Sequence, residues 1–300
     1  MVVELCIIFI DLVFTVLLTL FCVPTGHGYH YFAPFLFLIA GYLVGVIIMW
    51  CVLSLFTLPV SKKKKYAKKL SIFNSIWFEY QLGTDKLLSY GIKNVKTVPN
   101  FKYLCPVTEE DIDNYKKDRT FRYCTFSRVM EEKGISDAIT AVKSINDKAG
   151  KVIATLDIYG NIDDSYRTEF NRLTDLYSSF VTYKGAVSSM DSVKILQNYY
   201  ALLFPTKWRG EGFPGTILDS FASGVPVIAS DWKANKELVK TFKTGLVYPN
   251  EGLMSLVSCL EWANENVTKM RAMRKNCMEE YKKYTPEVVG KLILNDLNKE

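Results

Sequence analysis

The chain has 300 residues, of which 49% are hydrophobic and 14% aromatic, and its formal net charge is +6 at pH 7. This composition excludes intrinsic disorder, because it supplies enough apolar surface for a sizeable core. The charges are unevenly distributed, since residues 12–61 contain no Lys, Arg, Asp or Glu. We therefore expect a membrane part followed by a soluble part whose moderately basic surface suits anionic partners such as nucleotides or lipids.

Two apolar segments, residues 5–23 and 33–58, are each long enough to cross a hydrocarbon core of about 30 Å. They predict a membrane hairpin of two transmembrane helices over residues 1–60. A cleaved signal peptide is the alternative for the first segment, but its apolar run is too long and no Lys or Arg precedes it. A lysine cluster follows the second segment: Lys62, Lys63, Lys64, Lys65, Lys68 and Lys69. By the positive-inside rule these lysines predict a multi-pass membrane protein with a cytoplasmic soluble domain.

Residues 61–119 separate this hairpin from the main soluble domain. The amphipathic run at 76–91 predicts a helix that stops at Gly91, and residues 94–101 predict an extended piece. The polar stretch 108–119 predicts a linker. It contains Asp111 and Asp113 in a D-x-D pattern, a metal-nucleotide motif in other proteins, but no strand precedes them and we interpret them as solvated.

From Thr120 onward, strand-like runs alternate with helical patterns. Strands are expected at 121–126, 152–159, 180–185, 201–205, 225–230 and 245–249, with helices at 135–145, 166–177, 191–200, 216–223 and 235–240 between them, and final helices at 253–263, 267–282 and 286–297. Such alternation predicts an α/β fold in which right-handed crossovers join the strands of a doubly wound parallel sheet. Open α/β sheets bind ligands at the carboxyl ends of their strands, so the loops after 121–126 and 201–205 are the expected site.

The loop TKWRGEG after the fourth strand leads into a helix that begins near Pro214 and Gly215. Proline suits a helix start because its missing N–H is not needed there, and glycine lets a ligand approach the backbone. The free N–H groups and the dipole of a helix start attract phosphate. Glu211 in the loop and Asp219 on the helix are expected to flank one ligand and to accept hydrogen bonds from sugar hydroxyls.

A second cluster, formed by Ser127, Arg128, Lys133 and Gly134, lies where the first strand ends and its helix begins. Two cations on such a loop can neutralise a diphosphate, the arginine through its planar fork and the lysine as a point charge. The seven cysteines form no C-x-x-C pair, and both histidines, His27 and His30, precede the soluble part. We therefore expect no metal site and no histidine base there.

Residues 120–285 resemble the C-terminal, Rossmann-like half of the family 4 glycosyltransferases, a retaining family of the GT-B fold. The likeness is carried in family order by SRVMEEKG (127–134), LDIYG (156–160), YKGAV (183–187), LLFPTKWRGEGFPGTILDSFASGVPVIASDW (202–232) and TGLVYP (244–249). It implies that residues 108–300 form a nucleotide-sugar-binding domain. It also implies a metal-independent reaction that needs no cofactor and no enzyme nucleophile.

The resemblance assigns roles to single residues. In the family the Arg and Lys of the first motif hold the donor diphosphate, which maps onto Arg128 and Lys133. The two acids of the E-x7-E motif contact the donor sugar and the ribose, which maps onto Glu211 and Asp219, with Asp219 in place of the usual Glu. Glu211, Arg128 and Lys133 are therefore the expected catalytic group. Other donor-binding positions, near the phosphate, sugar or base, are Gly212, Phe213, Gly215, Thr216 and Val187.

The pattern G-x-G-x-x-G offers a dinucleotide-binding alternative, since residues 210–215 read GEGFPG and Asp231 follows the next strand. A dinucleotide loop should follow its strand directly and open the domain, whereas here several strands precede it. This alternative also leaves Arg128 and Lys133 unexplained. We therefore prefer a nucleotide-sugar site.

The family's N-terminal domain, which holds the acceptor site, is represented in this sequence only by residues 61–107, a remnant with its linker. The expected function is transfer of a sugar from a nucleotide-diphosphate sugar to a glycan or lipid-linked acceptor in cell-surface polysaccharide synthesis, with a second chain as a candidate source of the acceptor domain. The alternative is a truncated, catalytically incomplete donor-binding protein that acts as a partner subunit or remnant. Nucleic acid is not an expected partner.

Overall fold

The computed structural model describes residues 70, 72–114, 120–249 and 253–298. The predicted membrane hairpin lies outside these residues. Among the helices of the described part, none combines the length and the hydropathy needed to cross a membrane. The chain divides into two compact units, one of residues 1–77 and 83–96 and the other of residues 78–82 and 97–300.

Most residues of the small elements before the main sheet belong to the first unit, whereas residues 78–82 and Thr97 belong to the second. Strands β1 (Ile76–Phe78) and β2 (Val95–Thr97) form a two-stranded sheet, and helix α4 (Gln81–Ser89) connects them. The helix expected over 76–91 is therefore correct only from Gln81 onward. The three residues of β1, Ile-Trp-Phe, are β-branched or aromatic and favour a strand, and the Ile76 amide donates to the carbonyl of Asn94 at 2.7 Å.

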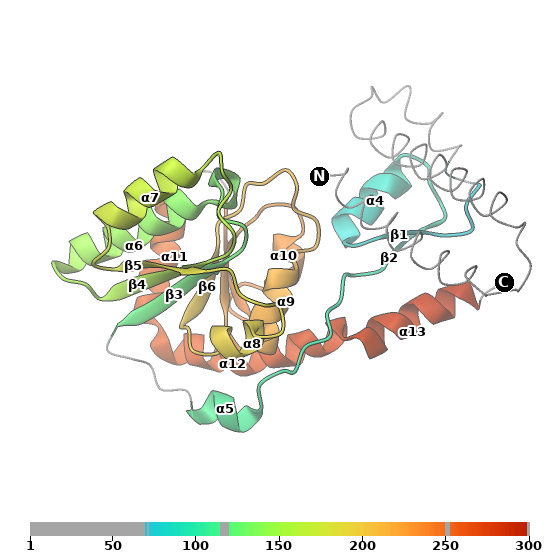
Figure 1. The fold of residues 1–300 in the computed structure, drawn as a ribbon. Coiled ribbons are helices and arrows are strands. Elements are labelled where there is room, and N and C mark those ends of the chain that lie inside the picture. The colour runs from blue at the N-terminus through green and yellow to red at the C-terminus, as the bar shows by residue number, and fades with distance from the viewer. Residues whose placement is uncertain (1–69, 71, 115–119, 250–252, 299–300) are drawn as a thin grey trace, which may run out of the picture. The chain divides into compact units, whose positions relative to one another are not determined.

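The second unit is built on a six-stranded sheet with the order β5-β4-β3-β6-β7-β8, and all paired strands are parallel. Its strands are β3 (Phe121–Phe126), β4 (Ala154–Tyr159), β5 (Val181–Gly185), β6 (Ala201–Phe204), β7 (Val227–Ser230) and β8 (Gly245–Tyr248). Its helices are α5 (Glu109–Asn114), α6 (Ile135–Ala149), α7 (Arg167–Leu176), α8 (Ser192–Leu196), α9 (Gly215–Ala222), α10 (Asn235–Leu238), α11 (Leu253–Glu265), α12 (Val267–Tyr281) and α13 (Pro286–Leu297), with 3₁₀ turns η1 (Glu131–Lys133) and η2 (Lys282–Tyr284). The predicted doubly wound parallel sheet is confirmed (Figure 1).

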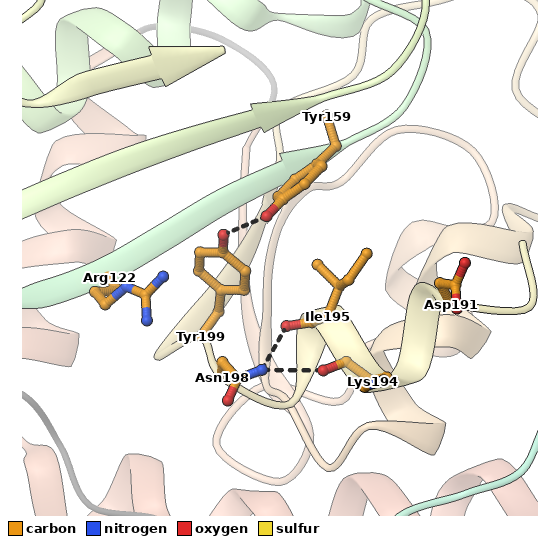
Figure 2. Close-up of a pocket in the computed structure, with 7 residues that line it drawn as sticks. All are labelled: Arg122, Tyr159, Asp191, Lys194, Ile195, Asn198 and Tyr199. Atoms are coloured by element: carbon orange, nitrogen blue, oxygen red, sulfur yellow. Dashed lines mark hydrogen bonds between the residues drawn. The ribbon is translucent and has the colours of Figure 1, made fainter. Parts of the chain in front are cut away.

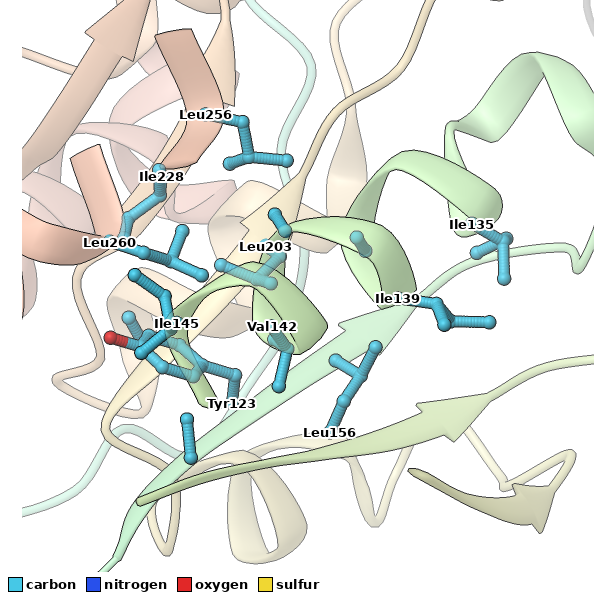
Figure 3. Packing of buried hydrophobic residues seen from close by; sticks show 14 of the residues in the cluster. Tyr123, Ile135, Ile139, Val142, Ile145, Leu156, Leu203, Ile228, Leu256 and Leu260 are labelled. Atoms are coloured by element: carbon cyan, nitrogen blue, oxygen red, sulfur yellow. The ribbon is translucent and has the colours of Figure 1, made fainter. Parts of the chain in front are cut away.

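Two layers of helices cover the sheet because neighbouring strand residues point to opposite faces. Tyr123 and Leu203 pack on one face against α6, α7 and α11, as Figure 3 shows around Ile139 and Leu260. Leu202 and the other residues that face the opposite way pack against α8, α9 and the second half of α12. Since both faces are buried, the strands read as continuous apolar runs.

The polar stretch expected to be a linker contains helix α5. Thr108 precedes this helix, its amide and hydroxyl both donate to an Asp111 carboxylate oxygen, at 2.8 and 2.7 Å, and the Asp111 amide donates back to the hydroxyl at 3.2 Å. This reciprocal arrangement is a capping box, which satisfies N–H groups at the helix start. Asp111 of the D-x-D pattern therefore caps a helix.

Candidate functional site

The strand order reverses between β3 and β6, so the loops that follow these two strands leave toward opposite faces of the sheet. The loops nevertheless meet. The Lys207 amide donates to the carbonyl of Glu132 at 2.7 Å, and the Thr216 hydroxyl donates to the carbonyl of Phe126 at 2.8 Å. The structure thus brings together the two loops that the sequence singled out.

A buried ion pair joins these loops. Lys133 Nζ lies 2.7 Å from Glu211 Oε2, and the two side chains are only 10% and 7% exposed. The Thr206 hydroxyl donates to the same carboxylate oxygen at 2.8 Å, and the ammonium lies 4.3 Å from the centre of the Trp208 ring. Two buried charges are tolerated because each has a partner of opposite charge or a hydrogen bond.

The second predicted acid, Asp219, is also paired. Lys102 Nζ lies 2.7 Å from each of its carboxylate oxygens, and the Ser192 hydroxyl donates to Oδ1 at 2.9 Å. Asp219 is 3% exposed. Burial raises the pKa of this carboxyl, while the charge of Lys102 and the hydrogen bonds from Lys102 and Ser192 oppose the rise.

Helix α9 begins at Gly215, so Pro214 is its N-cap residue and not its first helical residue. Hydrogen bonds hold both backbone groups of Phe213, the residue before this N-cap. The Phe213 amide donates to a carboxylate oxygen of Glu79 at 3.1 Å, and its carbonyl accepts from the Asn100 side chain at 3.3 Å. The amide of Phe213, a predicted donor-binding residue, therefore has an anionic partner within the chain.

The Glu79 carboxyl makes the stability of this region pH-dependent. Burial raises its pKa above the usual 4.5, although the Phe213 amide opposes the rise. A raised folded-state pKa contributes stability below the unfolded pKa, and that contribution is lost as the pH rises through the folded pKa. We therefore expect Glu79→Gln, which keeps an acceptor for Phe213, to raise the melting temperature at neutral pH and to change it little near pH 4. An unchanged difference between wild type and variant across thermal scans from pH 4 to 8 would contradict this assignment.

The remaining predicted residues frame the same edge of the sheet. Arg128 is exposed and precedes Lys133 in the loop after β3, whereas Val187, after β5, is half-buried and packs against the core on the α9 side. Gly212 lies between Glu211 and Phe213, and Thr216 is in the first turn of α9. All of them belong to loops or helix starts at the carboxyl ends of parallel strands, where an open α/β sheet binds its ligand.

A separate pocket of about 490 Å³ lies on the α8 side of the sheet (Figure 2). Its lining consists of Arg122, Tyr159, Asp191, Lys194, Ile195, Asn198 and Tyr199. The Tyr199 hydroxyl donates to Asp157 at 2.6 Å and lies 2.7 Å from the Tyr159 hydroxyl, and Arg122 stacks over the Tyr199 ring. Burial, together with the bond to Asp157, raises the pKa of Tyr199 far above its usual range. These groups bond to one another, and none of the predicted site residues lines the pocket.

The second unit is thus a doubly wound α/β domain in which a buried Lys–Glu pair lies where the strand order reverses, next to a second acid on the following helix. The model of the family described as glycosyl transferases group 1 matches residues 107–280. The chain therefore belongs to this family, and the resemblance read from the motifs is confirmed.

Known structures and sequences agree with this fold. The crystal structure of HepE from Anabaena in complex with UDP has a TM-score of 0.69 at 14% identity, covering 84% of this chain and 76% of that one. Sucrose-phosphate synthase from Thermosynechococcus elongatus has a TM-score of 0.65 at 17% identity, with 82% and 64% coverage. D-rhamnosyltransferase WbpZ from Pseudomonas aeruginosa is 28% identical over 103 residues, which are 34% of this chain and 27% of WbpZ. The match thus spans about a quarter of that curated relative.

Proposed function

We propose that the chain binds a nucleoside-diphosphate sugar at the carboxyl ends of β3 and β6 and transfers the sugar to a glycan or lipid-linked acceptor in cell-surface polysaccharide synthesis. The observation that carries this proposal is the buried Lys133–Glu211 pair, which joins the loops after these two strands. Family membership supports the reaction class. The HepE structure, which holds UDP, supports a nucleotide as the ligand.

In this proposal each charged group has a separate task. Arg128 and Lys133 hold the diphosphate and stabilise the negative charge that develops on it as the sugar departs, the largest contribution that such groups make. Glu211 accepts hydrogen bonds from the donor sugar, and Asp219 lies beside the nucleotide. Lysine and arginine can supply this stabilisation without a metal ion, so we propose a metal-independent reaction. We propose retention of stereochemistry from the resemblance to the family 4 glycosyltransferases alone.

The membrane anchor and the partners are further parts of the proposal. The apolar segments 5–23 and 33–58 with their lysine flank support a multi-pass anchor and a cytoplasmic donor domain. A lipid-linked acceptor would then meet the domain at the membrane surface. A second chain would supply the acceptor domain, of which residues 61–107 are only a remnant. Membrane fractionation of the full chain, followed by extraction at alkaline pH, tests the anchor: release into the soluble fraction would refute it.

The donor site is tested by titrating the full chain with UDP, GDP, ADP and dTDP. We expect one of these to bind and Arg128→Ala to weaken that binding by about 1–3 kcal/mol, as the loss of a charge-assisted hydrogen bond does. Arg167→Ala is the matched control, because Arg167, the first residue of α7, is an exposed arginine in an ion pair with Asp164. Equal affinity of wild type and Arg128→Ala would remove Arg128 from the site.

Turnover separates the enzyme from its alternative. If the corresponding nucleotide sugar is hydrolysed or its sugar is transferred to a lipid-linked acceptor, the glycosyltransferase proposal stands. Binding without turnover, even with lipid acceptors and membranes present, would instead indicate a donor-binding partner subunit. The family model matches residues 107–280, which we assign to the donor half. Because the match covers this half alone, a donor-binding partner subunit remains the alternative.

A further inference from the structure

Lys102 reaches the candidate donor site from a distant part of the sequence. It lies 117 residues from Asp219, in the segment between β2 and α5, and its ammonium bonds both oxygens of that buried carboxylate. Its side chain also runs past the start of α9: a methyl group added at Gly215 would lie 3.3 Å from Lys102 Cδ and 3.9 Å from its Nζ. The ammonium therefore sits beside the first residue of the helix that the donor is proposed to approach.

The backbone of Lys102 is fixed as firmly as its side chain. Its carbonyl accepts a hydrogen bond from the Tyr281 hydroxyl at 2.8 Å, and its amide donates to the carbonyl of Tyr284 at 3.3 Å. Tyr281 is 2% exposed and belongs to the core on the α9 side. A lysine held at its backbone and at its ammonium is preorganised, in contrast to a surface lysine that moves freely.

The Lys102–Asp219 pair changes which chemical groups the region beside the start of α9 presents to a ligand. An aspartate is one methylene shorter than the glutamate expected from the family motif, and Lys102 covers both of its oxygens. An ammonium has three protons and no acceptor, so after two bonds to Asp219 one N–H remains. The region beside the start of α9 thus presents a hydrogen-bond donor and a positive charge, both of which favour binding of a phosphate oxygen.

The position of Lys102 beside the start of α9 also favours a phosphate as the ligand. A cation near a helix N-terminus is unfavourable on its own, because the dipole places a partial positive charge there. The negative charge of Asp219 offsets this cost. When an anion approaches the first turn of α9, Lys102 and the free N–H groups of the helix would act on it together.

We propose that Lys102 is a third diphosphate-binding cation of the donor site and that Asp219 serves mainly to position its ammonium. This inference rests on the proposed function, since it assumes that a nucleoside diphosphate binds at the start of α9. It gives Asp219 a different task from direct contact with the ribose.

The test compares the full chain with Lys102→Met, using the nucleoside diphosphate that wild type binds best and the matching nucleoside without phosphates. We expect Lys102→Met to weaken the diphosphate about 10- to 100-fold and to leave nucleoside binding unchanged, whereas Lys102→Arg retains most of the affinity. Lys148→Met, which removes an exposed lysine from its pair with Glu261, is the matched control.

Removing Lys102 alone leaves Asp219 buried beside Ser192, so the folding of each variant is checked by thermal unfolding. The double variant Lys102→Met with Asp219→Asn removes both charges and provides a second measurement. If Asp219 acts through Lys102, the double variant binds the diphosphate no more weakly than Lys102→Met alone. A further tenfold loss would mean that Asp219 contacts the nucleotide directly and would overturn its positioning role.

The outcomes separate this inference from the proposed function. If wild type binds a nucleoside diphosphate in an Arg128-dependent way and Lys102→Met binds it equally well, Lys102 is not a donor-site cation although the donor site stands. Tighter binding by Lys102→Met would also overturn the inference, because Lys102 would then be a group that the ligand must displace. If wild type binds none of the four diphosphates, the proposed function itself fails.

Discussion

Replacing Gly134 by alanine is expected to lower the free energy of unfolding by about 2–5 kcal/mol, enough to unfold a marginally stable domain. Gly134 links η1 to α6 with a φ of 71°, a left-handed conformation that costs other residues energy. An added Cβ would also lie 2.2 Å from the Pro205 carbonyl oxygen, which is backbone and cannot move aside like a side chain. The contact matters for function because Pro205 follows β6 and Gly134 follows Lys133.

Gly150, at the other end of α6, provides the matched control. It has a φ of 65° and caps the same helix, but nothing lies within 4 Å of its added Cβ. Gly150→Ala should therefore carry only the conformational cost of about 1–2 kcal/mol. Urea unfolding of the second unit in both variants gives the comparison. Equal losses would show that the loops after β3 and β6 do not pack as closely as the structure indicates.

The sheet could be predicted from the sequence because its strands are short apolar runs separated by helical patterns. The structure ends the third of these helical patterns, 191–200, early: α8 stops at Leu196, not at residue 200. Tyr199 and Tyr200 leave the helix because the Tyr200 amide pairs with the carbonyl of Arg122 at the start of the sheet and the Tyr199 hydroxyl bonds Asp157. Tertiary pairing of this kind overrides local helical periodicity.

Some residues of the candidate site could likewise be predicted from the sequence, and others could not. Lys133 and Glu211 could be found because each belongs to a local motif at the end of a strand. The partners of Asp219 and of the Phe213 amide could not be found in this way. Lys102 carries no local pattern and meets Asp219 only through folding, and Glu79 reaches Phe213 across 134 residues of sequence. Sequence motifs therefore identify the loops of the site, whereas long-range partners such as Lys102 and Glu79 appear only in the folded chain.

Lys133→Met is expected to affect both stability and ligand binding, because Lys133 neutralises Glu211 in a buried place. Its removal leaves the Glu211 side chain, which is 7% exposed, with a hydrogen bond from the Thr206 hydroxyl but without its ammonium partner, and breaking a buried pair in this way costs about 3–5 kcal/mol. We expect that loss in urea unfolding, together with loss of nucleoside-diphosphate binding. Combining Lys133→Met with Glu211→Gln should recover a large part of the stability, because no buried charge then lacks a partner.

The recovery of stability without recovery of binding is the decisive result. In the double variant the fold no longer carries an uncompensated charge, so a continued loss of diphosphate binding is caused by the missing ammonium and not by partial unfolding. Arg128→Ala supplies the converse comparison, since Arg128 is exposed and its loss should weaken the ligand with little change in stability. If the double variant regained the affinity of wild type, Lys133 would be a structural partner of Glu211, and Arg128 and Lys102 would remain as the proposed cations for the diphosphate.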